Sequence, residues 1–207
     1  MTPVEALDYA SVFVFALTGA LVASRAQLDI VGFVFVSCLT AVGGGTLRDV
    51  VLDREVVFWV ARHSYIYTAT PAAIFVFFTA HFLESRYNTI RWLDAAALAV
   101  AVPAGAGVAI ALGHPPSIVV LMGVSTGCFG GLMRDVVCNE VPLVLKQGEL
   151  YVTCAFSGAV AGLFVLWITD QTGLALLVTG AMTFLLREGS LAFGWQLPVY
   201  KSRPPRV

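Results

Sequence analysis

Residues 44–51 read GGTLRDVV and residues 130–137 read GGLMRDVV, so the same glycine pair, Arg-Asp pair and valine pair recur 86 positions apart. Each copy lies in an apolar stretch, with the ionisable pair just beyond the glycines. A repeat that keeps polar and glycine positions in register indicates duplication of a structural unit. The organisation of the whole chain follows from these two octapeptides.

The same spacing relates further positions without a gap: Leu7-Asp8 with Leu93-Asp94, Gly19-Ala20 with Gly105-Ala106, Val22-Ala23 with Val108-Ala109, Thr40 with Thr126, and Tyr65 with Tyr151. A shared apolar composition explains the alanines and valines but not the acidic, glycine and aromatic matches. We therefore predict two copies of one three-helix unit, at about residues 7–83 and 93–168.

The composition indicates a membrane protein. Hydrophobic residues make up 58% of the chain and charged residues 12%, with a mean hydropathy of +0.86, whereas a soluble domain has roughly 25% charged residues. A spanning helix needs about 20 apolar residues. We predict an all-α polytopic protein that forms a single membrane domain over residues 1–207. Its seven transmembrane helices are predicted at Leu7–Ser24, Ile30–Leu52, Ile66–Leu83, Leu93–Leu112, Ser117–Cys138, Leu150–Ile168 and Gly173–Phe193.

The odd number of helices in each unit predicts inverted repeats, because the second copy enters the membrane from the opposite side. The seventh helix, at about 173–193, stands outside the duplication and precedes a basic tail over 194–207. Cytoplasmic loops carry an excess of Lys and Arg. One side receives Arg48, Arg54 and Arg62, and the other receives Arg25, Arg86, Arg91, Arg134, Lys146, Arg187, Lys201, Arg203 and Arg206. We predict an amino terminus outside and a carboxy terminus in the cytoplasm, where the tail faces anionic lipids.

Several functional classes are excluded. The formal net charge is −1 and no basic stripe is interleaved with aromatic residues, so we expect no nucleic-acid partner. The four cysteines form no CxxC and the three histidines show no ligand spacing, which argues against disulfides and zinc. We find no HExxH, GxSxG or Walker motif, and expect neither an enzyme nor a cofactor.

Gly43-Gly44-Gly45 lies near the middle of the second predicted helix, and Phe129-Gly130-Gly131 is its counterpart in the fifth. Three consecutive glycines are poor helix formers, so we predict a break or kink there. The backbone carbonyls freed by such a break suit a cation. The alternative is that the glycines only allow close helix packing, but the repetition beside Arg-Asp favours the break.

The ionisable residues Arg48, Asp49, Arg134 and Asp135 are costly within a spanning helix, so we expect them to face an interior or an aqueous path. A buried structural ion-pair network is the alternative, and both roles are compatible. Asp8 and Asp94 are interpreted first as helix N-terminal caps and second as path-lining residues. Tyr65 and Tyr151 are interpreted first as residues of the membrane interface and second as residues that contact the pore through the hydroxyl.

At the two octapeptides the sequence resembles the trimeric intracellular cation channel family, in its prokaryotic branch, which has also been grouped as a glycine transporter family. The resemblance covers nearly the whole chain. It implies a homotrimer in a prokaryotic inner membrane, with a hydrophilic pore in each protomer that passes monovalent cations such as potassium. The ion pathway that it implies consists of Gly43, Gly44, Gly45, Arg48, Asp49, Phe129, Gly130, Gly131, Arg134 and Asp135.

The resemblance to the family is weaker at one position of the fifth helix. It also implies an anionic lipid partner, for which the basic residues here are loose candidates. Phe129 stands where a full glycine triplet is expected, so exposure of the carbonyls in the fifth helix is less well supported than in the second. Basic residues of the animal members hold phosphoinositides, and here Arg134 and Lys146 are loose candidates for an anionic lipid.

Three functional hypotheses follow. The first is a cation channel gated at the glycines of the second and fifth helices, with Asp49 and Asp135 favouring cations. The second is a secondary transporter of a small zwitterion such as glycine, in which an arginine binds the carboxylate and an aspartate the amine; inverted repeats and broken helices fit it equally well. The third is a structural membrane protein without transport activity.

Overall fold

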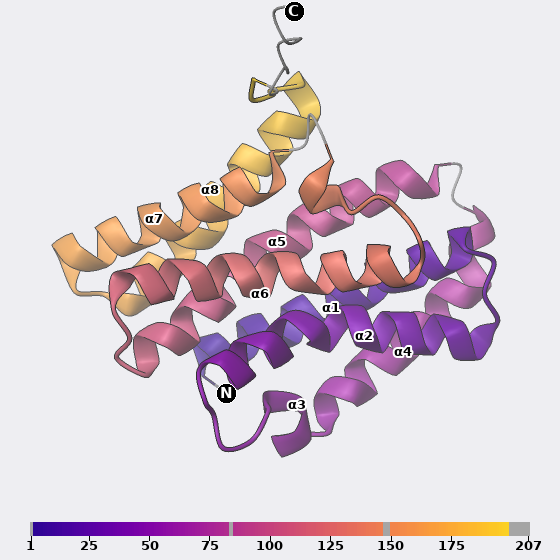
Figure 1. The fold of residues 1–207 in the computed structure, drawn as a ribbon, viewed down its shortest axis with the longest axis horizontal. Coiled ribbons are helices and arrows are strands. Elements are labelled where there is room, and N and C mark those ends of the chain that lie inside the picture. The colour runs from indigo at the N-terminus through magenta and orange to yellow at the C-terminus, as the bar shows by residue number, and fades with distance from the viewer. Residues whose placement is uncertain (1, 83–84, 147–149, 199–207) are drawn as a thin grey trace, which may run out of the picture.

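The computed structural model describes residues 2–82, 85–146 and 150–198, and this part of the chain is all-helical (Figure 1). Its elements are α1 (Pro3–Arg25), α2 (Ile30–Val51), α3 (Phe58–Ala61), α4 (Ser64–Thr79), α5 (Arg86–Ala111), α6 (Pro116–Val137), α7 (Tyr151–Thr169) and α8 (Thr172–Phe193), with 3₁₀ helices at Ala80–Phe82 and Leu143–Leu145. Seven helices in the described residues are long and apolar enough to span a membrane, counting α4 with its 3₁₀ extension as one. The predicted fold class is confirmed.

Two spans begin four or more residues earlier than predicted, because caps outside the apolar stretch start them. The Thr2 side chain accepts a hydrogen bond from the N–H of Glu5, and the Glu5 carboxylate accepts one from the N–H of Thr2, so α1 begins at Pro3 rather than Leu7. The Ser85 side chain caps α5, which begins at Arg86 rather than Leu93. Leu83 and the basic residues of the tail, Lys201, Arg203 and Arg206, lie outside the described residues.

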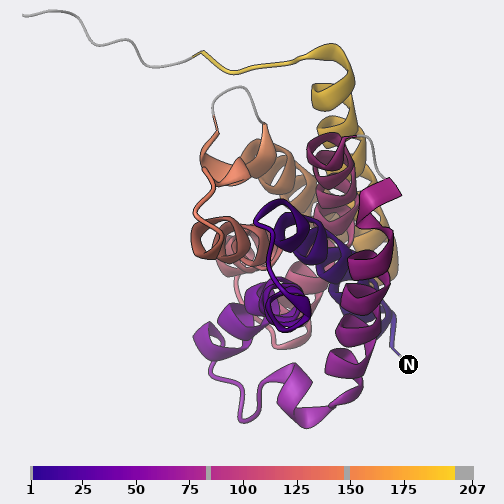
Figure 2. The same ribbon diagram turned by 90° about the vertical axis from the view of Figure 1, so that its right-hand side faces the viewer.

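The helices form two groups that meet where α1 packs on α5 and where α2 packs on α6. Helices α1, α2 and α4 contact one another, as do α5, α6 and α7, while α8 packs on α5 and α7. Figure 1 shows α2 and α6 side by side and antiparallel, so that their carboxy-terminal ends lie at opposite ends of the molecule. Figures 1 and 2 both place the short α3 at the lower edge, beside the start of α4. This arrangement separates the two Arg-Asp pairs.

Equivalent glycines bring the first two helices of each group together. A Cβ atom added to Gly19 of α1 would lie 2.8 Å from Oγ1 of Thr40 in α2, and one added to Gly105 of α5 would overlap Oγ1 of Thr126 in α6. Both contacts are closer than packed side chains tolerate. The repeat seen in the sequence is therefore also a repeat of backbone contacts.

The two groups meet through a reciprocal contact. A Cβ atom on Gly44 of α2 would overlap the carbonyl oxygen of Thr126 in α6, and one on Gly130 of α6 would overlap the carbonyl oxygen of Thr40 in α2. Such reciprocity is the pattern that a two-fold axis produces at an interface. Gly44 and Gly130 allow the backbones to touch at this crossing.

The break predicted at the glycines is wrong for this conformation, and the kink predicted as its alternative stays a prediction. Helix α2 runs through Gly43, Gly44 and Gly45, and α6 runs through Gly130 and Gly131, each as uninterrupted α-helix. An α-helical carbonyl accepts a hydrogen bond from the N–H four residues later, so these segments do not release carbonyls as a broken helix would. Each glycine lacks a side chain, and the backbone of the facing helix packs into the space this leaves. The alternative interpretation, in which the glycines allow close helix packing, describes this conformation.

Candidate functional site: two buried Arg-Asp networks and the cavities beside them

The first network lies at the carboxy-terminal end of α2. The Nη1 of Arg48 donates to Oδ1 of Asp8 in α1 at 2.9 Å, and its Nε donates to Oδ1 of Asp49 at 2.8 Å. Asp49 also accepts from Nη1 of Arg54, at 3.2 and 3.3 Å, and from the backbone N–H of Phe58 at 2.8 Å. Asp49 thus holds α2, the following loop and the start of α3 together.

The second network repeats this arrangement at the carboxy-terminal end of α6. The Nη1 of Arg134 donates to Oδ1 of Asp94 in α5 at 2.6 Å, and its Nε donates to Oδ1 of Asp135 at 2.7 Å. Oδ2 of Asp135 accepts from the N–H of Leu143 at 3.0 Å. The four Arg and Asp residues predicted as site residues are therefore brought together in two separate pairs, one at each end of the molecule.

These charges are buried. Arg48, Asp49 and Arg134 are 0% exposed, and Asp135 is 3% exposed. A charge at such depth persists only when it is paired and hydrogen-bonded. Neighbouring helical residues point about 100° apart and need not pair, yet each long arginine side chain here folds back onto the next residue while its Nη1 reaches a neighbouring helix. The networks brace the helices and, at the same time, border the cavities described below.

The interpretation of Asp8 and Asp94 as caps is wrong. Thr2 and Ser85 cap α1 and α5, and the two aspartates lie within those helices as partners of Arg48 and Arg134. Their spacing from the arginines, 40 residues in each half, was visible in the sequence as a repeated separation. Asp8 lines a cavity at the end of α2, and the second interpretation, a residue beside an ion path, stays a prediction for both aspartates.

The two tyrosines are buried rather than interfacial, with Tyr65 2% and Tyr151 1% exposed. Tyr65 stacks on Tyr9 with ring centroids 4.1 Å apart. The hydroxyl of Tyr151 instead donates to Oδ2 of Asp94 at 2.9 Å. The tyrosines occupy equivalent positions but make different contacts, so the two ends of the molecule are not identical.

Arg187 of α8 is a further buried ion that the sequence reasoning missed. Its side chain is 0% exposed, and its guanidinium carbon lies 5.1 Å from the centroid of the Tyr151 ring. The available signal was an arginine inside the apolar stretch of the seventh helix, which was counted only for its side of the membrane. Arg187 ties the helix outside the duplication to the network at the end of α6.

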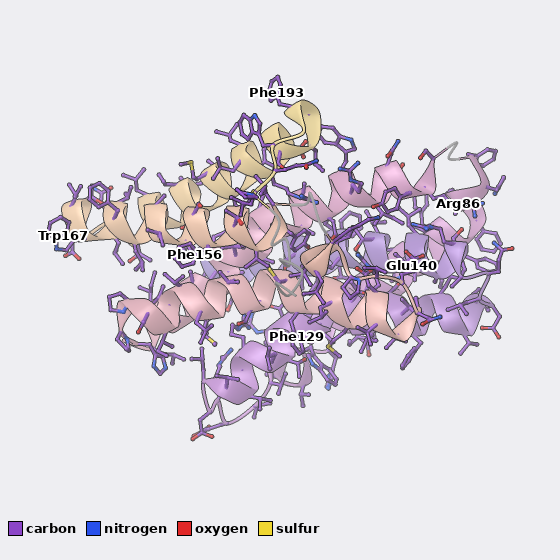
Figure 3. The ribbon with its side chains drawn as sticks, turned by 45° about the horizontal axis from the view of Figure 1, so that its top comes forward. Arg86, Phe129, Glu140, Phe156, Trp167 and Phe193 are labelled. Carbon is purple, nitrogen blue, oxygen red and sulfur yellow. The ribbon has the colours of Figure 1, made fainter. Side chains whose placement is uncertain are left out.

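Two cavities lie beside the networks. The α2-end cavity, about 510 Å³, is lined on its polar side by Glu5, Asp8, Arg54 and Arg62. The α6-end cavity, about 300 Å³, is lined on its polar side by Arg25, Tyr87, Arg134, Asp135, Glu140 and Lys146. Figure 3 shows Glu140 beyond the end of α6, at the same end of the molecule as Arg86. Each cavity therefore gathers ionisable side chains at one end of the helix bundle.

A separate small cavity lies between the α2-end network and the crossing of α2 and α6. It holds about 10 Å³ and is lined by Asp8, Ser11, Phe15, Ala41, Gly44, Gly45, Phe58, Ala101 and Thr126. A single water molecule needs roughly this volume. Asp8 and Phe58 line both cavities, so the water-sized cavity at the glycines is adjacent to the α2-end cavity.

The remaining predicted site residues lie along α2 and α6 on either side of the crossing. A Cβ atom on Gly43 would lie 3.0 Å from the sulfur of Met133, and one on Gly131 would lie 3.5 Å from Oδ2 of Asp94. Phe129 is half-buried midway along α6 (Figure 3). In residues 2–82, 85–146 and 150–198, no three His, Cys, Asp or Glu side chains are grouped as metal ligands.

At the surface of the α2-end cavity, Nη2 of Arg62 pairs with Oε1 of Glu5 at 2.9 Å. The hydrogen bond that Arg62 donates to this carboxylate raises the pKa of the Arg62 guanidinium above its already high usual value, so Arg62 stays charged. The cavity therefore presents both signs of charge.

The chain is similar in sequence to a known family of membrane proteins. The family model described as "Glycine transporter" matches twice, over residues 5–81 and 91–167, which are the two halves of the duplication. The UPF0126 inner membrane protein YadS of Escherichia coli (strain K12) is 33% identical over 94% of this chain and 94% of its own, and the UPF0126 membrane protein YvgT of Bacillus subtilis (strain 168) is 32% identical over 94% and 95%.

Solved structures give the same result. The TRIC trimeric intracellular cation channel orthologue from Rhodobacter sphaeroides is 42% identical, with a TM-score of 0.90 over 94% of this chain and 100% of that one. A prokaryotic TRIC channel crystallised in 0.5 M KCl is 28% identical, with a TM-score of 0.86 over 94% and 98%. The resemblance stated from the octapeptides is confirmed. With both halves matched by one family model, and with relatives this similar along nearly its whole length, the chain belongs to the family described as "Glycine transporter", in the prokaryotic TRIC branch.

Proposed function

We propose that the protein is a channel for monovalent cations, potassium among them, with one path through each protomer. The observation that carries the proposal is the pair of ion networks at opposite ends of the antiparallel helices α2 and α6, each beside a cavity. The solved structures that the chain resembles are of cation channels rather than enzymes. A path between the two cavities crosses the contact of Gly44 and Gly130.

Four carboxylates near this path, each offset in part by a paired arginine, support cation preference. Asp8 and Asp49 lie at one end and Asp94 and Asp135 at the other. Carboxylates near a pore raise the local concentration of cations, and rings of Asp or Glu are the usual device of cation channels. Backbone carbonyls around Gly43 to Gly45 and Gly130-Gly131 are proposed to contact the ion when the helices bend. In the present conformation they belong to uninterrupted helix.

The present conformation is proposed to be closed. At the end of α2 the path narrows to the water-sized cavity beside Gly44 and Gly45. At the end of α6, Asp94 is 1% exposed and is bonded by both Arg134 and Tyr151. Opening then requires α2 and α6 to separate or bend at the glycines and Tyr151 to release Asp94. Small residues at these positions permit such a change because no side chain interlocks the backbones.

The assembly and its placement are part of the same proposal. We infer a homotrimer in the inner membrane, with inverted repeats, an external amino terminus, a cytoplasmic carboxy terminus and anionic lipids at the cytoplasmic face. The trimeric state is that of the TRIC orthologue from Rhodobacter sphaeroides, and the YadS relative is described as an inner membrane protein. The distribution of Lys and Arg supports the orientation.

Ion flux from proteoliposomes tests the proposal. Vesicles loaded with potassium and carrying the purified protein are predicted to release it when diluted into a potassium-free medium, if a counter-ion path is supplied. Protein-free vesicles provide the background. Release no faster than that background, from vesicles in which trimers are verified by cross-linking, would rule out a potassium channel.

The second candidate is a transporter of a small zwitterion such as glycine. It is favoured by the description of the matching family model and by the α2-end cavity, which presents Glu5 beside Arg54 and Arg62. An arginine suits a carboxylate and a glutamate suits an ammonium group. Saturable uptake of labelled glycine that depends on an ion gradient would support it, and uptake equal to that of empty vesicles would count against it.

A further inference from the structure

Arg54 and Glu140 occupy equivalent places in the two halves but carry opposite charges. Position 140 follows position 54 by the repeat spacing of 86. Asp53 and Asn139, which precede them, both adopt left-handed backbone, with φ of 51° and 55°. The N–H of Arg54 bonds to the carbonyl of Asp49 at 3.0 Å, and the N–H of Glu140 bonds to the carbonyl of Asp135 at 2.8 Å. The same turn therefore presents a cation at one end of the path and an anion at the other.

The side chain of Arg54 turns onto the Asp49 carboxylate. Its Nη1 lies 3.2 and 3.3 Å from the two carboxylate oxygens. The Arg54 side chain is 37% exposed and Asp49 is 0% exposed. Because Arg54 also lines the α2-end cavity, its guanidinium stands between that cavity and the acidic group, where it offsets part of the carboxylate's negative potential.

Asp135, the equivalent of Asp49, has no arginine in the turn that follows it, because Glu140 stands at the position equivalent to Arg54. Glu140 lines the α6-end cavity with Asp135 and pairs with Arg25 at 3.4 Å. Lys146 lines the same cavity, with Nζ against the hydroxyl of Tyr87. Glu140 therefore adds negative charge at the position where Arg54 adds positive charge. The two mouths of the path differ by two charge units at this single repeated position.

On the channel function proposed above, we propose that Arg54 is a specificity-determining residue, which lowers cation entry at the α2-end mouth by covering the Asp49 carboxylate. Glu140 has the opposite effect at the α6-end mouth. Arg25, Arg134 and Lys146 also line the α6-end cavity, so the effect is isolated by changing residues 54 and 140 singly and not by the total charge of each mouth. Removal of the Arg54 charge leaves Asp49 bonded to Arg48 and to the N–H of Phe58, so the fold around it keeps its main contacts.

The magnitude follows from Coulomb's law. One charge at roughly 8 Å from a cation in water changes the local cation concentration by about two-fold, and by more at a lower effective dielectric constant. The Debye length is about 30 Å at 0.01 M salt and about 3 Å at 1 M. The effect of a mouth charge is therefore expected at low salt and is expected to disappear at high salt.

Current–voltage curves of the whole protein in planar bilayers test the proposal with three variants. In about 0.01 M KCl, Arg54→Gln is expected to raise the potassium current that enters from the α2-end mouth by about two-fold or more relative to the current in the opposite direction. Glu140→Gln, the matched variant of the other half, is expected to lower the current that enters from the α6-end mouth. Arg54→Lys keeps the charge and is expected to keep the wild-type asymmetry. In about 1 M KCl all four proteins are expected to give the same curve shape.

An Arg54→Gln curve identical in shape to the wild-type curve at low salt would overturn the role of Arg54, as would an Arg54→Lys curve that matches Arg54→Gln. Both results leave the channel function intact, because the wild-type protein conducts in each. Absence of any cation current from the wild-type protein contradicts the proposed function itself and removes this inference with it.

Discussion

Arg134 and Asp94 are joined by a 2.6 Å hydrogen bond between Nη1 and Oδ1 in a place where both side chains are almost fully buried. The bond links the carboxy-terminal end of α6 to the first turns of α5. Its equivalent, Arg48 with Asp8 at 2.9 Å, links α2 to α1 at the opposite end. Each half of the duplication is thus closed by one long-range ion pair.

Loss of the carboxylate from such a pair is predicted to destabilise the protein severely. Asp94→Asn leaves the guanidinium of Arg134 with Asp135 as its remaining carboxylate partner, and disruption of a buried pair costs about 3–5 kcal/mol. Asp170→Asn is the control, because Asp170 is exposed in a left-handed turn that asparagine also adopts. Thermal unfolding in detergent, followed by loss of the monodisperse peak, is expected to occur at a lower temperature for Asp94→Asn alone. Equal midpoints for both variants would contradict the account of this network.

The crossing of α2 and α6 is predicted to tolerate no added methyl group. Gly44→Ala and Gly130→Ala place a Cβ on the carbonyl oxygens of Thr126 and Thr40, and overpacking of this kind costs about 1–3 kcal/mol. Gly173→Ala in α8 is the control, since no described heavy atom lies within 4 Å of its added Cβ. Lower thermal midpoints are expected for the first two variants and not for the third. A Gly44→Ala protein as stable as Gly173→Ala would show that the helices separate readily.

Tyr151 is predicted to hold the path closed. Tyr151→Phe removes the hydroxyl that bonds Asp94 at 2.9 Å, a contact worth about 1 kcal/mol. If release of Asp94 accompanies opening, the ratio of open to closed channels rises by about five-fold for that energy. Tyr65→Phe is the matched change in the other half, where the ring stacks on Tyr9. The fraction of time that single channels are open measures this ratio for each variant. If Tyr151→Phe is open no more often than Tyr65→Phe, the gate does not involve the bond between Tyr151 and Asp94.

The protein is predicted to lie in the membrane with its amino terminus outside the cytoplasm. In a variant without the native cysteines, Glu55→Cys lies in the exposed loop after α2 and Leu28→Cys in the exposed loop after α1. A membrane-impermeant maleimide applied to intact cells is expected to label Glu55→Cys, and to label Leu28→Cys only after the membrane is opened. The reverse pattern would show that the excess of Lys and Arg lies outside.

Much of the fold could be predicted because the membrane imposes it. Apolar length identifies a span, and the register of Gly44-Gly45 and Arg48-Asp49 with Gly130-Gly131 and Arg134-Asp135 identifies the duplication. The caps at Thr2 and Ser85 were less visible, because they lie before the apolar stretches and act through single hydrogen bonds. The short helix α3 was not predicted for the same reason. It begins where the N–H of Phe58 donates a hydrogen bond to the Asp49 carboxylate.

The site was predicted as a set of residues but not as a set of contacts. Glycine propensity predicted a break in α2, yet packing of Gly44 against Thr126 holds the helix intact, since tertiary contacts override local propensity. The pairing of Arg134 with Asp94 and the approach of Arg187 to Tyr151 join distant parts of the chain. One sequence specifies no such distances. The ten predicted pathway residues therefore remain a proposal about ion movement.

The central claim is that cations cross each protomer, and recording in a planar bilayer with unequal KCl on the two sides tests it most directly. The account predicts discrete unitary currents that reverse near the potassium equilibrium potential and persist when chloride is replaced by a large organic anion. Currents that reverse near the chloride potential, or a silent membrane containing intact trimers, would contradict it.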